Sequence, residues 1–203
     1  MVVEKDRFSL VINVGTILCG CPWFNNIKNK KENMNNEKLE HPFQPLVFKD
    51  SNVLILGSFP SVDSFDKAFY YAHPRNQFWK ILSEITAYPI NNRDQKTWLL
   101  KEFNFALWDM VATCTRDNSL DSSLDEIEVN NMAEFLEEHP SIKKVAFTGR
   151  LAEKLFKMHF DYLEIETVYL PSPSSAYANM SFENKVALYK EKLEKVDQWQ
   201  FGQ

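Results

Sequence analysis

Cysteine is scarce in this sequence, which holds Cys19, Cys21 and Cys114 in 203 residues. Three cysteines provide neither a paired disulfide framework nor the four ligands of a closed zinc or iron–sulfur site. We therefore expect a reducing compartment and no closed zinc or iron–sulfur site.

A long uninterrupted apolar run is missing as well. The longest apolar stretch covers residues 8–24, which is shorter than the ~20 residues of a membrane-spanning helix. It is also broken by four residues, Asn13, Gly15, Gly20 and Pro22. No membrane anchor is expected; export remains an alternative, because residues 18–21 weakly resemble a lipoprotein cleavage box.

Positive charge is not in excess, because 23 Lys and Arg stand against 28 Asp and Glu, a net charge of −5. Neutralisation of phosphates supplies most of the non-specific affinity of proteins for nucleic acids. A protein that coats nucleic acid over a broad basic surface is therefore disfavoured. Any contact with nucleic acid should be local and sensitive to salt.

The chain divides into a polar extension and one domain. Residues 25–40 are almost all Asn, Lys and Glu, which is the composition of a solvated linker. The hydrophobic content of 44% is enough for one substantial core. We expect an extension and linker over residues 1–40, poorly ordered in part, and a single domain over residues 41–203.

Strands and helices alternate along this domain. Residues 53–56 are consecutive and apolar, which is typical of a parallel strand buried on both faces. Further strands are predicted over residues 105–111, 143–149 and 166–170, a polar loop over 113–123, and helices over 75–86, 94–103, 130–138, 149–160 and 182–196. The pattern predicts a three-layer α/β/α sandwich with a central four-stranded, mainly parallel sheet. Some other doubly wound domain is the alternative.

Polar and aromatic residues are concentrated in two loops that follow predicted strands. The first loop begins at Gly57 and contains the sequences GSFPS and YYAHPRNQFW, and the second, PSPSSAYA, begins at Pro171. Ligands of open α/β sheets bind at the carboxyl ends of the strands. Both loops should therefore contribute to one recognition pocket.

The sequences GSFPS at 57–61 and YYAHPRNQFW at 70–79 resemble the hypoxanthine-DNA glycosylase family of the uracil-DNA glycosylase superfamily. The resemblance extends over roughly residues 41–195. It implies a uracil-DNA glycosylase-like fold and a base-excision repair enzyme that acts as a monomer on DNA containing a deaminated base. Such an enzyme needs no metal and no cofactor, and we expect it in the cytoplasm with its nucleoid in a bacterium or in the nucleus of a eukaryote. Since none of the sequences GSFPS, YYAHPRNQFW and PSPSSAYA contains a lysine, and the nearest are Lys67 and Lys80, we expect a monofunctional glycosylase rather than a lyase.

The resemblance also implies roles for residues of the first loop. Tyr71 occupies the position that stacks under the flipped base, and Asn76 is the candidate catalytic residue, orienting water through its amide. Asn76 is also well suited to cap a helix. The other expected base contacts are Gly57, Ser58, Phe59 and His73, where Phe59 replaces the Asp or Asn of other superfamily members and His73 could instead pin the loop.

Contacts to the DNA backbone are expected from both loops. Serine hydroxyls bind phosphates, and prolines keep such a loop stiff. The candidates are Pro60, Ser61, Arg75, Ser172, Pro173, Ser174 and Ser175. Two acidic residues, Asp109 and Asp121, match family positions as accessory groups that tune the site or hold the loop through Arg116.

Three other functions compete with this interpretation. A uracil- or mismatch-specific glycosylase of the same superfamily would use the same loops. A catalytically inactive nucleic-acid-binding relative is disfavoured by the acidic balance of the chain. A hydrolase using Ser58 and His73 would lack the Gly-x-Ser-x-Gly turn that exposes a nucleophile.

Overall fold

A computed structural model of the chain describes residues 38–193. Most of the expected extension, with Cys19 and Cys21, and the end of the last predicted helix lie outside the described residues. None of the helices within residues 38–193 is long and apolar enough to cross a membrane.

The central sheet is the predicted one. It has four parallel strands in the order β3-β2-β6-β7. Their bounds are β2 (Val53–Gly57), β3 (Phe105–Asp109), β6 (Lys144–Thr148) and β7 (Glu166–Leu170). Every residue of β2 is buried, as expected for a central strand covered on both faces. The predicted α/β fold class is confirmed.

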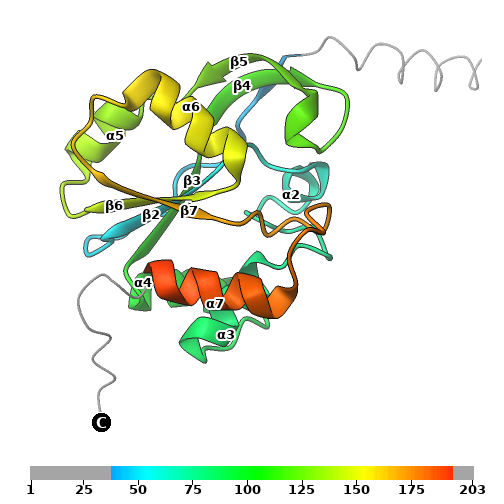
Figure 1. Cartoon of the computed structure of the whole chain (residues 1–203), viewed down its shortest axis with the longest axis vertical. Coiled ribbons are helices and arrows are strands. Elements are labelled where there is room, and N and C mark those ends of the chain that lie inside the picture. Colours follow the sequence, from blue (N-terminus) through cyan, green and yellow to red (C-terminus); the bar gives the residue numbers. More distant parts are fainter. Residues whose placement is uncertain (1–37, 194–203) are drawn as a thin grey trace, which may run out of the picture. The chain divides into compact units, whose positions relative to one another are not determined.

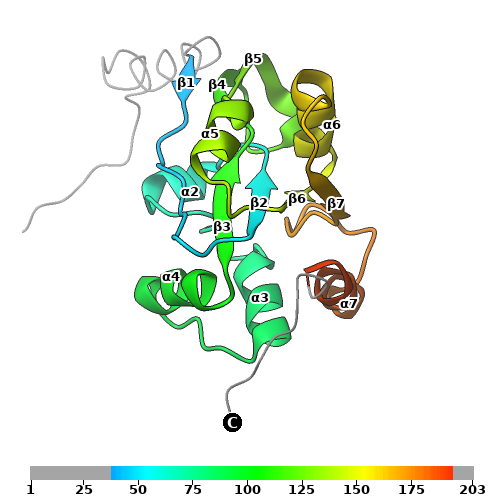
Figure 2. The same ribbon diagram turned by 90° about the vertical axis from the view of Figure 1, so that its left-hand side faces the viewer.

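Helices cover both faces of this sheet (Figures 1 and 2). Val53 and Ile55 pack into one hydrophobic cluster with α3 (Phe78–Thr86), α4 (Arg93–Glu102) and α7 (Phe182–Leu193). Leu54 and Leu56 pack into a second cluster with α5 (Met132–Glu138) and α6 (Arg150–Phe160). Because alternate residues of a strand point to opposite faces, β2 separates the two helical layers.

The start of α3 corrects the sequence prediction, which began this helix at residue 75. The helix begins at Phe78, whose amide donates to Asn76 Oδ1 (2.9 Å). The amide of Asn76 itself donates to the carbonyl of His73 (2.9 Å). Residues 73–77 therefore form turns that carry side chains to the edge of the sheet.

A second, antiparallel sheet was not predicted. It consists of β1 (Leu39–Glu40), β4 (Val111–Arg116) and β5 (Leu124–Val129), in the order β1-β4-β5. The polar loop predicted over residues 113–123 is therefore wrong in its first part, and Asp121–Ser123 form a short 3-10 turn. The pairing of β4 with β5 is irregular at two places, which breaks the period-2 alternation that identifies strands. The end of the expected linker, residues 39–40, forms β1.

Candidate active site

A pocket of about 590 Å³ lies at the carboxyl ends of β2, β3 and β6. The fold brings both loops to it. The sequence-predicted residues that line it are Gly57, Ser58, Phe59, Pro60, Ser61, Tyr71, Asn76, Asp109, Asp121, Ser172, Pro173 and Ser174. Three predicted residues, His73, Arg75 and Ser175, do not line it.

Gly57 makes room for the polar groups at the floor of this pocket. It pairs with Asp109 in the register of β2 and β3. A side chain at position 57 would collide with Asp109 Oδ1 and would come within 2.9 Å of the Tyr71 hydroxyl. The glycine is therefore required by close approach of these groups.

Tyr71 is held in one orientation. Its backbone is left-handed, with φ of 52°, a conformation that is uncommon outside glycine and costs roughly 1–2 kcal/mol. Its ring stacks on Phe78 at 3.9 Å between centroids, and its hydroxyl lies 2.9 Å from Thr148 Oγ1. Burial raises the pKa of Tyr71, and the nearby Asp109 raises it further, so the hydroxyl stays neutral.

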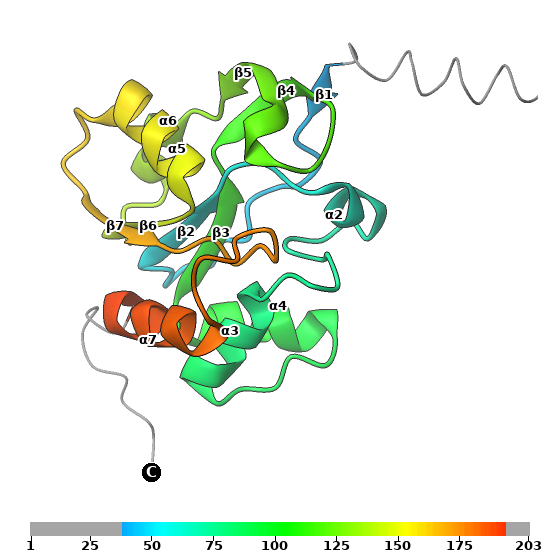
Figure 3. The same ribbon diagram turned by 45° about the vertical axis from the view of Figure 1, so that its right-hand side comes forward.

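Asn76 contacts both the start of α3 and the pocket. Its Oδ1 accepts a hydrogen bond from the amide of Phe78 at the start of α3, and the residue also lines the pocket. The next residue joins the two loops, because the amide of Gln77 donates to the carbonyl of Pro173 (2.9 Å). Figure 3 shows the segment after β7 beside the turns that precede α3.

His73 is part of its own loop. Its Nε2 lies 3.7 Å from Asp63 Oδ2, and its Nδ1 accepts from the amide of Arg75 (3.1 Å). Both contacts favour the loop-pinning interpretation of His73 over a contact with the base. Arg75 and Ser175 are exposed.

Ser61 is the N-terminal cap of the short helix α2 (Val62–Asp66), which lies at one wall of the pocket. Its hydroxyl accepts from the amide of Ser64 (3.3 Å), which is the ordinary bond of an N-terminal cap. The carbonyl of the preceding Pro60 accepts from the Arg116 guanidinium (2.5 Å). Arg116 also lies over Phe59, 5.2 Å from the ring centroid, so β4 supports this loop from behind.

Asp121 lies at the rim of the pocket in the turn between β4 and β5. It accepts a hydrogen bond of 2.5 Å from Ser58 rather than from Arg116. Asp121 as a whole is exposed to solvent, but its carboxyl group is surrounded by protein on the pocket side. The resulting desolvation raises the pKa of Asp121, the Ser58 bond opposes this shift, and the charge of Asp109 adds to it.

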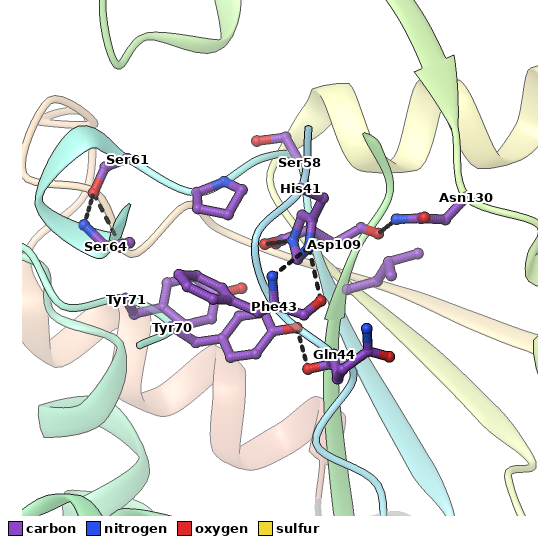
Figure 4. A network of polar contacts seen from close by, with 12 residues as sticks. His41, Phe43, Gln44, Ser58, Ser61, Ser64, Tyr70, Tyr71, Asp109 and Asn130 are labelled. Carbon is purple, nitrogen blue, oxygen red and sulfur yellow. Dashed lines mark hydrogen bonds and ion pairs between the residues drawn. The ribbon is translucent and has the colours of Figure 1, made fainter. Parts of the chain in front are cut away.

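Asp109, at the end of β3, is paired with a residue that the sequence analysis missed. His41 Nε2 lies 2.9 Å from Asp109 Oδ2, and the two side chains are 5% and 6% exposed. Figure 4 shows this pair with Tyr70 and Tyr71 nearby. The sole sequence signal was that His41 begins the stretch at which the family resemblance starts.

The second loop presents serine hydroxyls in a fixed arrangement. The Ser172 hydroxyl accepts from the amide of Ser174 (3.3 Å), and the Ser174 hydroxyl accepts from the amide of Ala176 (3.2 Å). Each hydroxyl therefore retains its own O–H for donation to a ligand. Tyr189 anchors the loop by donating to the carbonyl of Pro171 (2.9 Å).

The β6–α6 junction contributes a further wall of the pocket. It includes Thr148, Gly149, Arg150 and Lys154. The Arg150 guanidinium lies 3.7 Å above the centroid of the Tyr169 ring, and the exposed Lys154 stands at the rim. Within residues 38–193, no group of three or more His, Cys, Asp or Glu side chains is arranged to hold a metal ion.

Comparisons with known proteins agree on one family. The family model of the uracil DNA glycosylase superfamily matches residues 45–197. A protein named hypoxanthine DNA glycosylase from Methanosarcina acetivorans is 29% identical over 145 residues, which covers 70% of this chain and 91% of that protein. A protein of the same name from Methanosarcina barkeri is 31% identical over 110 residues, 53% of this chain and 70% of that protein.

A solved structure gives the same result. The solution NMR structure of a Methanosarcina acetivorans protein, whose name places it among the uracil DNA glycosylases, superposes with a TM-score of 0.65. The two chains are 28% identical, and the match covers 78% of this chain and 99% of the other.

Proposed function

Because the chain belongs to the uracil DNA glycosylase superfamily, we propose that it hydrolyses the N-glycosidic bond of deoxyinosine in DNA. The reaction releases hypoxanthine and leaves an abasic site. Two relatives named hypoxanthine DNA glycosylase support this choice of base. The observation that carries the proposal is the pocket in which Tyr71, Asn76 and Asp109 come together between two DNA-facing loops.

An enzyme of this kind must first take the damaged base out of the helix. Extruding a nucleotide costs a few kcal/mol, which stacking against an aromatic side chain helps to offset. Tyr71 lines the pocket and rests on Phe78 through one ring face. The extruded base stacks against the exposed part of the Tyr71 ring, and the rigidity of this ring keeps the entropy lost on binding small.

Asn76 then orients the attacking water. One lone pair of Oδ1 is occupied by the amide of Phe78, and a carbonyl oxygen has a second lone pair for water. The side-chain NH₂ group can donate to the leaving base. A neutral amide cannot accept a proton at neutral pH, so it forgoes part of the ~10²- to 10⁴-fold acceleration that a general base supplies.

Phe59 leaves its position in the first loop without a polar side chain for the reaction. Its ring packs 5.7 Å from Phe65 and under the Arg116 guanidinium, so it offers neither a carboxylate nor an amide. The polar groups come instead from Asn76 and from β3. This arrangement favours hypoxanthine over uracil as the preferred base, since the first loop lacks the Asp or Asn of the uracil enzymes.

The serines of the second loop position the DNA. Ser172 and Ser174 line the pocket and retain O–H donors that suit phosphate oxygens. The bond between Gln77 and Pro173 holds this loop against the first. The DNA backbone therefore binds next to the pocket through a few hydrogen bonds. Such local contacts suit a protein with a net negative charge.

Base release from defined oligonucleotides tests the proposal. Duplexes that carry inosine, uracil or xanthosine are incubated with the protein, and alkali then cleaves any abasic site. We expect inosine to be processed fastest. Faster release of uracil would identify a uracil enzyme, and binding of DNA without release of any base would identify an inactive relative.

Replacement of Asn76 tests the mechanism. Asn76→Ala should slow hypoxanthine release roughly 10²- to 10³-fold, the scale for loss of one preorganised polar group. Loss of the bond to Phe78 should cost about 1 kcal/mol of stability. Thermal unfolding therefore accompanies the rate measurement, with the exposed Asn184→Ala as control. A folded Asn76→Ala protein with the parent rate would remove Asn76 from the mechanism.

A further inference from the structure

Both the backbone and the ring of His41 are held in place by their contacts. Its amide donates to the carbonyl of Ala112 in β4 (2.7 Å), directly after the paired residues of β1. The ring lies among aromatic side chains, with centroid distances of 5.6 Å to Phe43, 5.9 Å to Phe59 and 6.1 Å to Tyr70. The imidazole therefore has one well-defined position.

Both ring nitrogens of His41 have partners. Nε2 lies 2.9 Å from Asp109 Oδ2. Nδ1 lies 2.9 Å from the carbonyl oxygen of Phe43 and 3.3 Å from its amide nitrogen. Nδ1 can thus accept from the amide when the ring is neutral or donate to the carbonyl when it is protonated. In either state, the N–H at Nε2 donates a hydrogen bond to Asp109 Oδ2.

The two oxygens of Asp109 have different surroundings. Oδ2 is bound by His41, whereas Oδ1 faces Gly57, where the absence of a side chain leaves it close to the pocket. A buried carboxylate that loses its hydrogen-bond donor loses much of the compensation for its desolvation. Without His41, this contact would no longer oppose rotation of the Asp109 carboxylate about the Cβ–Cγ bond.

We propose that His41 is a positioning residue, which holds Asp109 by Oδ2 so that Oδ1 receives a proton from the attacking water. This inference rests on the proposed glycosylase function. As the water oxygen forms a bond to C1′ of the sugar, the C1′–N bond breaks and its electron pair leaves with the base. One water proton passes to Asp109 Oδ1 and then to solvent, while the departing base takes a proton from solvent.

This role complements the one proposed for Asn76. The amide of Asn76 can orient water but cannot remove its proton, and Asp109 is a carboxylate lining the same pocket. A negative charge at Asp109 also stabilises the positive charge that develops on the sugar. The alternative is a purely architectural pair, in which His41 and Asp109 join the N-terminal strand to the central sheet without affecting the reaction.

A matched set of substitutions separates these alternatives. In His41→Gln, the side-chain amide nitrogen can reach the position of Nε2. In His41→Asn, the side chain is too short for its amide nitrogen to reach that position. His41→Leu removes the donor altogether. Under single-turnover conditions, we expect the Asn and Leu variants to release hypoxanthine roughly 10²-fold more slowly, the scale for a misplaced reacting group. The Gln variant should recover most of that loss.

Affinity and stability complete the test. All three variants should bind inosine-containing DNA nearly as well as the parent, because Tyr71 and the serine loop are intact. If His41→Leu fails to fold, the Gln and Asn pair decides the question. Equal rates for Gln and Asn, or loss of thermal stability without loss of rate, would overturn the role of His41 while leaving the glycosylase function in place. A parent protein that releases no base would overturn both proposals.

Discussion

Lys185 Nζ lies 2.9 Å from Gln77 Oε1, so an amine on α7 is bonded to the residue that precedes α3. The same amine lies 3.2 Å from the carbonyl oxygen of Tyr177 in the second loop. Lys185 is 1% exposed, and burial lowers its pKa. One buried side chain thus connects both loops of the pocket to a helix of the core.

Replacement of this lysine should loosen the second loop. Lys185→Met keeps an unbranched side chain as far as Cε but leaves two acceptors without their donor, at a cost of about 1–3 kcal/mol. We expect a lower unfolding temperature and weaker binding to inosine-containing DNA, measured by calorimetry and fluorescence anisotropy. The exposed Lys80→Met on α3 is the control. Unchanged DNA affinity in a destabilised Lys185→Met protein would show that the connection supports the fold alone.

A methyl group at position 57 should damage the floor of the pocket. In Gly57→Ala, the new Cβ would meet Asp109 Oδ1 and the Tyr71 hydroxyl, so both groups must move. Overpacking of this kind costs about 1–3 kcal/mol. Displacement of reacting groups by about 1 Å can cost 10²-fold in rate. We expect a folded protein with a strongly reduced single-turnover rate; a parent-like rate would mean that Asp109 and Tyr71 need not hold their positions.

The pH dependence of stability should report the environment of Asp121. Its pKa is raised in the folded protein, so the protonated form favours folding and that contribution disappears as the pH rises through the folded pKa. Asp121→Asn cannot ionise and can still accept from Ser58. The variant should therefore unfold at a higher temperature than the parent at about pH 7.5, with the difference shrinking toward about pH 4. A difference that grows on acidification would contradict this assignment.

Borohydride should trap no covalent complex with DNA. A lyase needs an amine that attacks the sugar, and none of the sequences GSFPS, YYAHPRNQFW and PSPSSAYA contains a lysine. The structure adds one amine that the sequence did not place at the pocket, Lys154 of α6, which stands exposed at the rim. Incubation with inosine-containing DNA and borohydride, followed by denaturing electrophoresis, provides the measurement. An adduct that disappears in Lys154→Ala would establish a bifunctional enzyme.

Residues 1–37 should be dispensable, whereas a deletion that extends four residues further should not. Removal of residues 1–37 keeps β1, His41 and the ion pair of Lys38 with Glu128 (2.8 Å). Removal of residues 1–41 deletes the partner of Asp109. We expect the shorter deletion to release hypoxanthine at the parent rate and the longer one to be slow. A folded but inactive protein lacking residues 1–37 would show that the extension completes the site.

The parallel sheet could be predicted because its strands are marked by composition. Val53, Leu54, Ile55 and Leu56 are consecutive and buried, and the loops at the ends of such strands must meet at one edge. The antiparallel sheet carries no such mark. β5 has the sequence LDEIEV with no fully buried residue, and β4 is irregular, so both resemble polar loop.

The pairing of His41 with Asp109 could not be predicted from local patterns. The two residues are 68 positions apart, and they meet because β1 pairs with β4, which follows β3 directly. The directions in which the side chains of the first loop point could not be predicted from the sequence either. His73 and Arg75 flank Pro74 in a turn, and small changes of backbone angle there decide whether a side chain enters the pocket or turns away.

The turn over residues 117–123 is mounted on β4 and β5 rather than on the central sheet. It reaches the first loop through Ser58 and Asp121, and through Ser119, which accepts from the amide of Val62 (3.2 Å). One wall of the pocket therefore belongs to the antiparallel sheet. We expect exchange of residues 117–123 between homologues to leave the four parallel strands in place and to alter base selectivity.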